Sequence, residues 1–131
     1  MPEQVRKLLI VDDDPGIRSQ LKWGFKDYEI YTAENRNNAL EQFCKHNPPV
    51  VTLDLGLPPD KDGISEGYKI LEQILNKAPE TRVIVVSASE ERENRIRAVA
   101  SGAFEYHPKP IKLEQLAEII ERAYNDYKKI N

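Results

Sequence analysis

The chain has 131 residues, 40% of them hydrophobic and 31% charged, a composition typical of a folded domain and not of a disordered segment. Its 19 basic and 22 acidic side chains leave a net charge of -3, so no overall positive field favours direct binding of nucleic acid. The single cysteine, Cys44, excludes an internal disulfide. The first residues lack the apolar segment of a secretory signal, and no apolar run could span a bilayer, so we expect a cytoplasmic domain without membrane contact.

Buried strands and amphipathic helices alternate in the first half of the chain. Strands are predicted at Leu8–Val11 and Glu29–Ala33. Asp14 and Pro15 are typical of the N-cap and first position of a helix between them. Asn35 is a candidate cap for a second helix, with Cys44 among its apolar positions, which we expect to end before the two prolines at 48 and 49.

The second half repeats this alternation. A strand over 50–53 runs directly into Asp54 and a proline-rich loop, and the following helix has apolar positions from Tyr68 to Leu75. Further elements are predicted as a strand at Arg82–Val86, a helix at Glu90–Ser101 closed by Gly102, a strand at Ala103–Tyr106 and a helix at Leu113–Tyr127.

Five strands that alternate with five helices predict an α/β domain with a parallel sheet covered by helices on both faces, because right-handed crossovers impose this arrangement. We expect one domain over residues 1–131 with its core at about 5–127. The tail Lys128–Asn131 is predicted to be the start of a linker or a frayed end.

Polar residues follow four of the five predicted strands. Because parallel strands end at the same edge of a sheet, we expect these residues to converge: Asp12, Asp13, Asp54, Ser87 and Lys109. Clustered carboxylates repel one another unless a cation binds, and Mg²⁺ prefers oxygen ligands. A carboxylate nucleophile beside a divalent ion, a hydroxyl and a lysine indicates phosphoryl transfer.

Each of these residues also has a simpler interpretation when it is considered alone. Asp54 could cap a loop, Ser87 could begin a helix, and Lys109 could be a solvated surface lysine. Asp14 is best explained as a helix cap. The bond between Lys109 and Pro110 could be cis, which would aim the lysine at the sheet edge. The combination of residues, and not any one of them, carries the functional prediction.

The order and spacing of these motifs closely resemble the receiver domain of two-component response regulators over nearly the whole chain. The matching residues are Leu8 to Asp13 with Pro15, Leu53 and Asp54 with Pro58, Ser87 and Ala88, Gly102 and Ala103, and Tyr106 with Lys109 and Pro110. The resemblance implies a flavodoxin-like, doubly wound sheet in the strand order 2-1-3-4-5, for which a receiver is a standard example.

The resemblance also implies a role for each matching residue. Asp54 corresponds to the phosphoacceptor and Lys109 to the phosphate-binding lysine. Asp13 corresponds to a direct Mg²⁺ ligand and Asp12 to a water-mediated one, together with Asp54 and the backbone carbonyl of Gly56. Ser87 and Tyr106 correspond to the hydroxyl and the aromatic side chain that switch on phosphorylation.

The loop after the third predicted strand is several residues longer than is typical of receivers, because Asp62 and Gly63 come late. The run from Leu57 to Gly67 is similar to receivers fused to enhancer-binding AAA+ activators of exopolysaccharide and exosortase (PEP-CTERM) systems. That similarity would make the chain the N-terminal module of a longer transcription regulator, with an output domain after it.

The implied partners are a histidine kinase or phosphotransfer protein, and the domain would be a signalling switch that catalyses only its own phosphorylation and dephosphorylation. A homodimer is compatible with the family surface formed by the last two predicted helices and the strand between them, where the candidate contacts are Ala98, Tyr106, Ile111 and Tyr124.

Two alternatives remain open. A haloacid-dehalogenase-like phosphatase would use Asp12 and Asp14 as its Asp-x-Asp motif, with Lys109 as its lysine, but would leave Asp54 without a role. A receiver-fold interaction module that is never phosphorylated is the second alternative.

Overall fold

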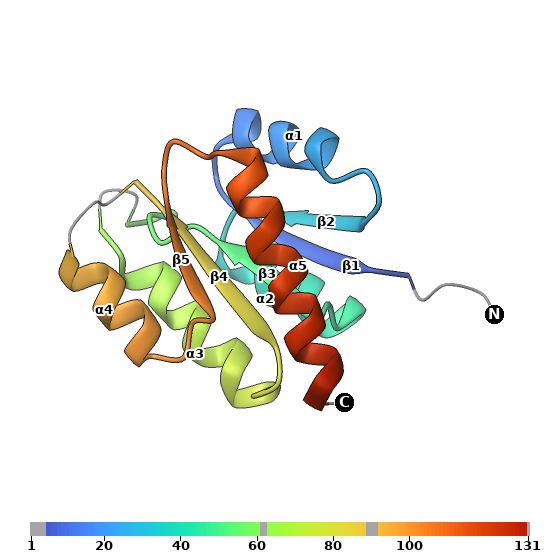
Figure 1. The fold of residues 1–131 in the computed structure, drawn as a ribbon. Coiled ribbons are helices and arrows are strands. Elements are labelled where there is room, and N and C mark those ends of the chain that lie inside the picture. The colour runs from blue at the N-terminus through green and yellow to red at the C-terminus, as the bar shows by residue number, and fades with distance from the viewer. Residues whose placement is uncertain (1–4, 61–62, 89–91, 131) are drawn as a thin grey trace.

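The computed structural model describes residues 5–60, 63–88 and 92–130 (Figure 1). Its strands are β1 (Lys7–Val11), β2 (Glu29–Ala33), β3 (Val50–Leu53), β4 (Arg82–Ser87) and β5 (Glu105–Pro108). Its helices are α1 (Pro15–Gly24), α2 (Arg36–His46), α3 (Ser65–Lys77), α4 (Arg92–Ala100) and α5 (Leu113–Ile130).

The five strands form one parallel sheet in the order β2-β1-β3-β4-β5. Helices α1 and α5 cover one face of the sheet, and α2, α3 and α4 cover the other (Figure 1). The predicted fold class and strand order are therefore confirmed. All strands end at one edge of the sheet, which is where open α/β sheets place their sites.

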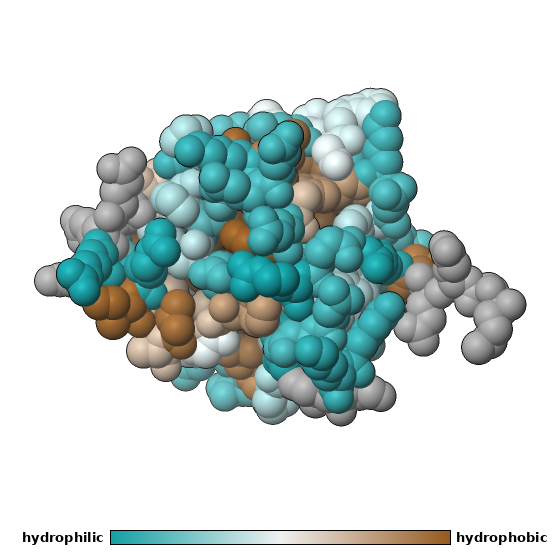
Figure 2. Space-filling model, viewed as in Figure 1, coloured by the Kyte–Doolittle hydropathy of each residue, from teal (hydrophilic) through white to brown (hydrophobic). Residues whose placement is uncertain are grey.

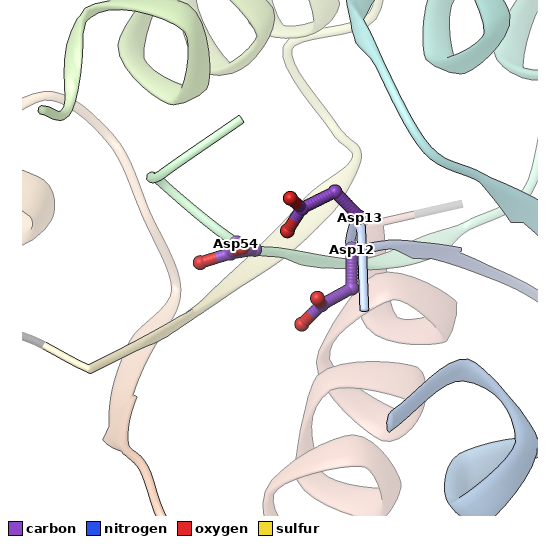
Figure 3. A group of neighbouring side chains, drawn as sticks. All are labelled: Asp12, Asp13 and Asp54. Atoms are coloured by element: carbon purple, nitrogen blue, oxygen red, sulfur yellow. The ribbon is translucent and has the colours of Figure 1, made fainter. Parts of the chain in front are cut away.

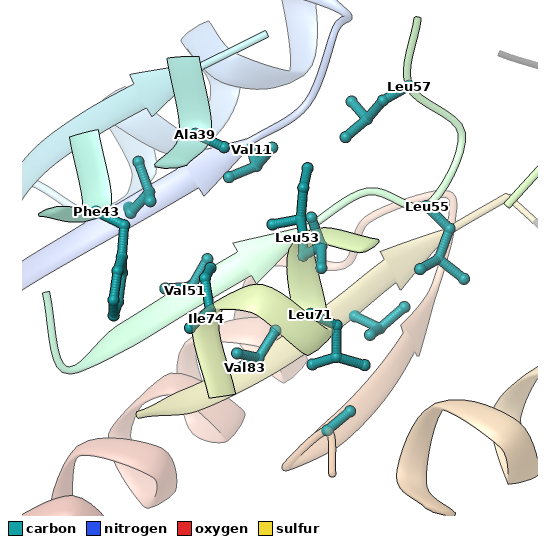
Figure 4. Close-up of a cluster of buried hydrophobic side chains, with 14 of the residues drawn as sticks. Val11, Ala39, Phe43, Val51, Leu53, Leu55, Leu57, Leu71, Ile74 and Val83 are labelled. Atoms are coloured by element: carbon teal, nitrogen blue, oxygen red, sulfur yellow. The ribbon is translucent and has the colours of Figure 1, made fainter. Parts of the chain in front are cut away.

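Two hydrophobic cores follow from the alternation of side chains along the strands. The core against α2, α3 and α4 is shown in Figure 4 and includes Val51, Leu53, Phe43, Leu71 and Ile74. The core against α1 and α5 includes Leu8, Ile10, Leu21, Leu116 and Ile120. Strands β1, β3 and β4 contribute to both cores, so they are buried on both sides.

Both predicted N-caps are confirmed by side-chain hydrogen bonds. Oδ1 of Asp14 accepts the backbone N–H of Gly16 at 2.8 Å, at the start of α1. Oδ1 of Asn35 accepts the backbone N–H of Asn38 at 2.9 Å, at the start of α2. These oxygens accept hydrogen bonds from N–H groups that have no partner within the helix, so they stabilise the starts of α1 and α2 just after the ends of β1 and β2.

Three predicted details are wrong, and one lies partly outside the described residues. The fifth strand begins at Glu105 and not at Ala103, because the N–H of Ala103 bonds to the carbonyl of Ala98 in the turn that closes α4. Helix α5 continues as far as Ile130, into the tail that was predicted as the start of a linker or a frayed end. Cys44, expected on the apolar face of α2, is exposed. Of the helix predicted from Glu90, residues 92–100 are helical and residues 90 and 91 are not described.

The long loop after β3 is fixed where it joins α3. The N–H of Gly67 donates to the carbonyl of Leu55 at 3.2 Å, and a Cβ on Gly67 would lie only 2.4 Å from the Cα of Leu55. Only glycine allows this approach of helix to loop. The buried carboxylate of Glu66 pairs with Arg36 of α2 at 3.3 Å and with Lys69 at 3.4 Å. Thus α3 is tied both to the loop and to α2.

The predicted dimer contacts are mainly core residues. Ala98, Tyr106 and Tyr124 are buried, whereas the exposed large hydrophobic residues of α4 are Ile96 and Val99. Figure 2 shows hydrophobic surface over α4 on a face that is otherwise mostly hydrophilic. None of the helices in the described part of the chain combines the length and apolar character that crossing a membrane requires.

Candidate functional site

Three carboxylates meet where β1 and β3 end side by side (Figure 3). The N–H of Asp54 donates to the carbonyl of Val11 at 2.8 Å, so the sheet pairing continues as far as the acids. One carboxylate oxygen from each of Asp12, Asp13 and Asp54 lies within 4.8 Å of the others. The predicted convergence of these acids is therefore present in the structure.

Asp12 is buried and has a partner for each oxygen. Its Oδ1 accepts the backbone N–H of Asp14 at 2.9 Å, and its Oδ2 lies 2.9 Å from Nζ of Lys109. The guanidinium of Arg18, on α1, donates to the backbone carbonyl of Asp12 at 2.8 Å. These contacts hold the end of β1 against both the first helix and the lysine, as burial of a charge requires.

Lys109 reaches the acids from the loop between β5 and α5. Its backbone N–H donates to the carbonyl of Ser87 at 2.7 Å. Its ammonium lies 2.9 Å from Oδ2 of Asp12 and 3.5 Å from Oδ1 of Asp54. Burial lowers the pKa of Lys109, but its bonds to Asp12 and Asp54 outweigh that effect and raise the pKa above the ordinary value. The peptide bond between Lys109 and Pro110 is cis, as the sequence suggested.

The effects on the pKa of Asp54 balance differently from those on Lys109. Burial and the neighbouring charge of Asp12 raise its pKa to about 6, against the opposing effects of Lys109 and of the Gly56 N–H, which donates to Oδ1 at 3.3 Å. Only 6% of the residue is exposed. The site therefore disfavours the charged form of Asp54 unless a further cation is bound.

This pKa has a consequence for stability in the absence of divalent ions. Unfolded Asp54 loses its proton near pH 4 and folded Asp54 near pH 6, so its contribution to stability is full below pH 4 and is lost as the pH rises through 6. Asp54→Asn should then raise the free energy of unfolding by about 2 kcal/mol at pH 7.5, with little gain at pH 4. Denaturant unfolding in EDTA checks this.

A control variant and a comparison of two pH values make that measurement specific to Asp54. Asp14→Asn makes the same chemical change at an exposed acid outside the cluster and keeps a residue that caps helices, so it serves as the control variant. A gain for Asp54→Asn that is the same at both pH values would contradict a raised pKa.

The donor set fits a hard divalent cation. Three carboxylates within one ion's reach supply the oxygen ligands that Mg²⁺ prefers, and they hold more negative charge than Lys109 alone neutralises. Burial and the neighbouring charge of Asp12 raise the pKa of Asp54, and a bound cation would oppose both effects. The residues present thus agree with the predicted Mg²⁺ site.

The remaining predicted residues lie at the end of β4, on β5 and in the loop after β3. Ser87 is buried at the end of β4, where its carbonyl holds the backbone of Lys109. Gly56 follows Asp54 by two residues and donates to it. Tyr106 is only 4% exposed on β5, and the guanidinium of Arg95, on α4, lies 5.3 Å from its ring centroid.

Sequence reasoning missed two residues that support the site. Arg18 binds the backbone of Asp12, and its only signal was a cation one turn into the helix that follows the acids. His107 accepts the N–H of Lys112 at 3.2 Å beside the loop that carries Lys109. His107 comes directly after the predicted strand Ala103–Tyr106, and its place within β5 became clear only from the structure.

Comparisons with known proteins agree with this geometry. The sequence profile of the response regulator receiver domain matches residues 8–121. The chain is 32% identical to the chemotaxis protein CheY of Listeria monocytogenes, over 89% of this chain and 97% of CheY. A crystal structure of a CheY-like receiver domain protein from Methanospirillum hungatei superposes with a TM-score of 0.87 at 26% identity, covering 98% of this chain and 100% of the other.

A longer relative matches through only part of its length. The chain is 35% identical to the regulatory protein AtoC of Escherichia coli over 91% of this chain, which spans only 25% of AtoC. The match to the receiver profile spans residues 8–121, a range that includes the acidic cluster, and the structural match covers 98% of the chain. The chain therefore belongs to the response regulator receiver domain family of two-component signalling.

Proposed function

We propose that this domain accepts a phosphoryl group on Asp54 and that phosphorylation changes the surface formed by α4, β5 and α5. The observation that carries the proposal is the placement of Lys109, whose ammonium lies 3.5 Å from Oδ1 of Asp54 and 2.9 Å from Oδ2 of Asp12, at the cluster that Asp13 completes. A carboxylate nucleophile with fixed cationic and anionic neighbours is suited to receive a phosphoryl group.

The transfer begins with attack of an Asp54 oxygen on the phosphorus of a phosphohistidine or of a small donor such as acetyl phosphate. The bond from phosphorus to the donor breaks, the donor keeps that electron pair, and an acyl phosphate forms on Asp54. Hydrolysis later returns the carboxylate and releases inorganic phosphate. Lys109 stabilises the charge on the phosphoryl oxygens in both steps, because its position is fixed at Asp12 and at the Ser87 carbonyl.

Asp12, Asp13, Asp54 and the Gly56 carbonyl are the groups that would hold Mg²⁺. When bound, the ion supplies positive charge that offsets the acids and the transferred group. The residues of the chain do the remaining work, since they orient Asp54 and exclude water from its buried side.

The proposed switch involves Ser87 and Tyr106. A phosphoryl group on Asp54 would draw the Ser87 hydroxyl toward it, and the buried ring of Tyr106 would adjust with it. Because Tyr106 contacts Arg95, this adjustment would alter the surface of α4, β5 and α5. That surface is the candidate site for a second copy or an output domain.

The partners follow from the same proposal. A histidine kinase or phosphotransfer protein would supply the phosphoryl group. The output is proposed to be transcription, because the relatives include the DNA-binding transcriptional regulator NtrC of Escherichia coli, 24% of whose length matches this chain. The receiver itself would act on an attached output domain and would not bind DNA directly.

The test is incubation of the chain with acetyl phosphate and Mg²⁺, followed by intact mass spectrometry. We expect stoichiometric addition of one phosphoryl group, removed by hydroxylamine as acyl phosphates are, and none in EDTA. Turnover of an external phosphomonoester without self-labelling would favour the phosphatase alternative. In that alternative Asp14 would need to act in catalysis, but its side chain accepts the N–H groups of Gly16 and Ile17 as a cap.

The interaction-module alternative is tested by a beryllofluoride titration. Phosphoryl-like binding at Asp54 that requires Mg²⁺ would support the receiver. An NMR spectrum that does not change with Mg²⁺ and beryllofluoride, in a chain that also fails to label, would support the unphosphorylated module.

A further inference from the structure

His107 is a buried imidazole that the chemistry proposed above does not use. It lies on β5 next to Val86 of β4 and is only 3% exposed. Tyr106 belongs to the core against α2, α3 and α4, and Val86 to the core against α1 and α5. Because side chains alternate along a strand, His107 is on the face that α5 covers.

Among the described residues, the imidazole accepts a hydrogen bond from the start of α5. The backbone N–H of Lys112 donates to Nε2 of His107 at 3.2 Å. Lys112 immediately precedes α5, and its carbonyl accepts the N–H of Leu116 at 2.9 Å, so it is the residue from which the helix begins. An Nε2 that accepts a hydrogen bond carries no proton, so the neutral ring is protonated on Nδ1.

This bond closes the loop on which Lys109 stands. Four residues, 108–111, separate His107 from Lys112. The loop is held at Lys109, whose N–H bonds to the Ser87 carbonyl at 2.7 Å, and at Lys112, whose N–H bonds to the ring. From this loop the Lys109 side chain reaches Asp12 at 2.9 Å and Asp54 at 3.5 Å. A displacement of the loop of about 1 Å would be enough to impair such an alignment.

We propose that His107 is a positioning residue for Lys109: its imidazole fixes the start of α5 and so holds the loop that presents the ammonium to Asp54. The inference rests on the proposed function of Asp54 and deepens it. Burial and the charge of Lys112 lower the pKa of His107, which agrees with a neutral ring that accepts a hydrogen bond.

Two polar variants of similar size distinguish this role from simple packing. The Oε1 of His107→Gln can take the place of Nε2, whereas the shorter side chain of His107→Asn places its oxygen where Nδ1 was. We expect His107→Asn to slow labelling by acetyl phosphate about tenfold and His107→Gln to stay within about threefold of the natural chain. Mg²⁺ affinity should not fall in either variant, because no Mg²⁺ ligand is altered.

Equal slowing in the two variants would overturn the proposal, since packing and not the acceptor would then be the cause. A natural rate in His107→Asn would overturn it as well. Thermal unfolding and backbone NMR establish that both variants are folded before the rates are compared.

A second readout is independent of phosphorylation. The NMR signals of the Lys112 amide and of the Lys109 ammonium, recorded without a phosphodonor, should shift in His107→Asn and stay close to their natural positions in His107→Gln. If the natural chain does not label, the proposed function fails, and these signals alone decide the role of His107. Unchanged Lys109 signals in His107→Asn would then reject it.

Discussion

Asp54→Asn is expected to abolish labelling of the chain by acetyl phosphate or phosphoramidate in the presence of Mg²⁺. The amide has the same shape and can still accept the N–H of Gly56 through its oxygen, so the fold and the site geometry should persist. It lacks the nucleophilic oxygen on which an acyl phosphate forms. Intact mass spectrometry of the natural and variant chains after equal incubation measures the effect, and peptide mapping locates the label.

Asp14→Asn is the matched control for this experiment. It makes the same chemical change at an exposed acid two residues beyond Asp12, and asparagine still caps α1. We expect this variant to label at the natural rate. Full labelling of the Asp54→Asn variant, or a label that maps to Asp12 or Asp13, would assign the nucleophile elsewhere.

Lys109→Ala is expected to slow labelling about 10²-fold, which is typical for loss of one preorganised charge at a transition state. The ammonium is the only cation with a described contact to Asp54, and no other described lysine or arginine is ion-paired with either Asp12 or Asp54. Mg²⁺ affinity should not fall with the rate and should instead increase, because Asp12 no longer has a competing ammonium. Rapid-mixing labelling assays and calorimetric Mg²⁺ titrations measure the two effects.

Lys129→Ala serves as its control, because it removes one positive charge from an exposed position near the end of α5. Its labelling rate and Mg²⁺ affinity should equal those of the natural chain. Parallel loss of Mg²⁺ affinity and rate in Lys109→Ala would instead indicate collapse of the acidic cluster, and the catalytic role of the lysine would be rejected.

The fold was accessible from the sequence because local signals and long-range patterning agree. Continuous apolar runs identified the strands of the sheet centre, and the caps at Asp14 and Asn35 fixed the starts of α1 and α2. The boundary of β5 was not accessible in this way. Ala103 has a strand-like neighbourhood in the sequence, but its N–H is used by the turn after α4.

The site was accessible as far as topology determines it. Parallel strands bring Asp12, Asp54 and Lys109 to one edge, and the structure confirms that they meet there. Contacts made by backbone groups leave no comparable pattern in the sequence. The hold of Arg18 on the Asp12 carbonyl and of His107 on the Lys112 N–H depends on where the turns place main-chain atoms. The chemical roles of the site residues stay predictions until the experiments above are done.

The close contact between Gly67 and Leu55 has a consequence for how such a domain can diversify. Leu55 and Leu57 are fully buried at the start of the loop, and Gly67 locks its end, so added length is confined between two anchored points. Insertions or deletions there would reshape the rim of the site without moving Asp54. Partner recognition could therefore change in a lineage, or in an engineered chain, while the chemistry stays constant.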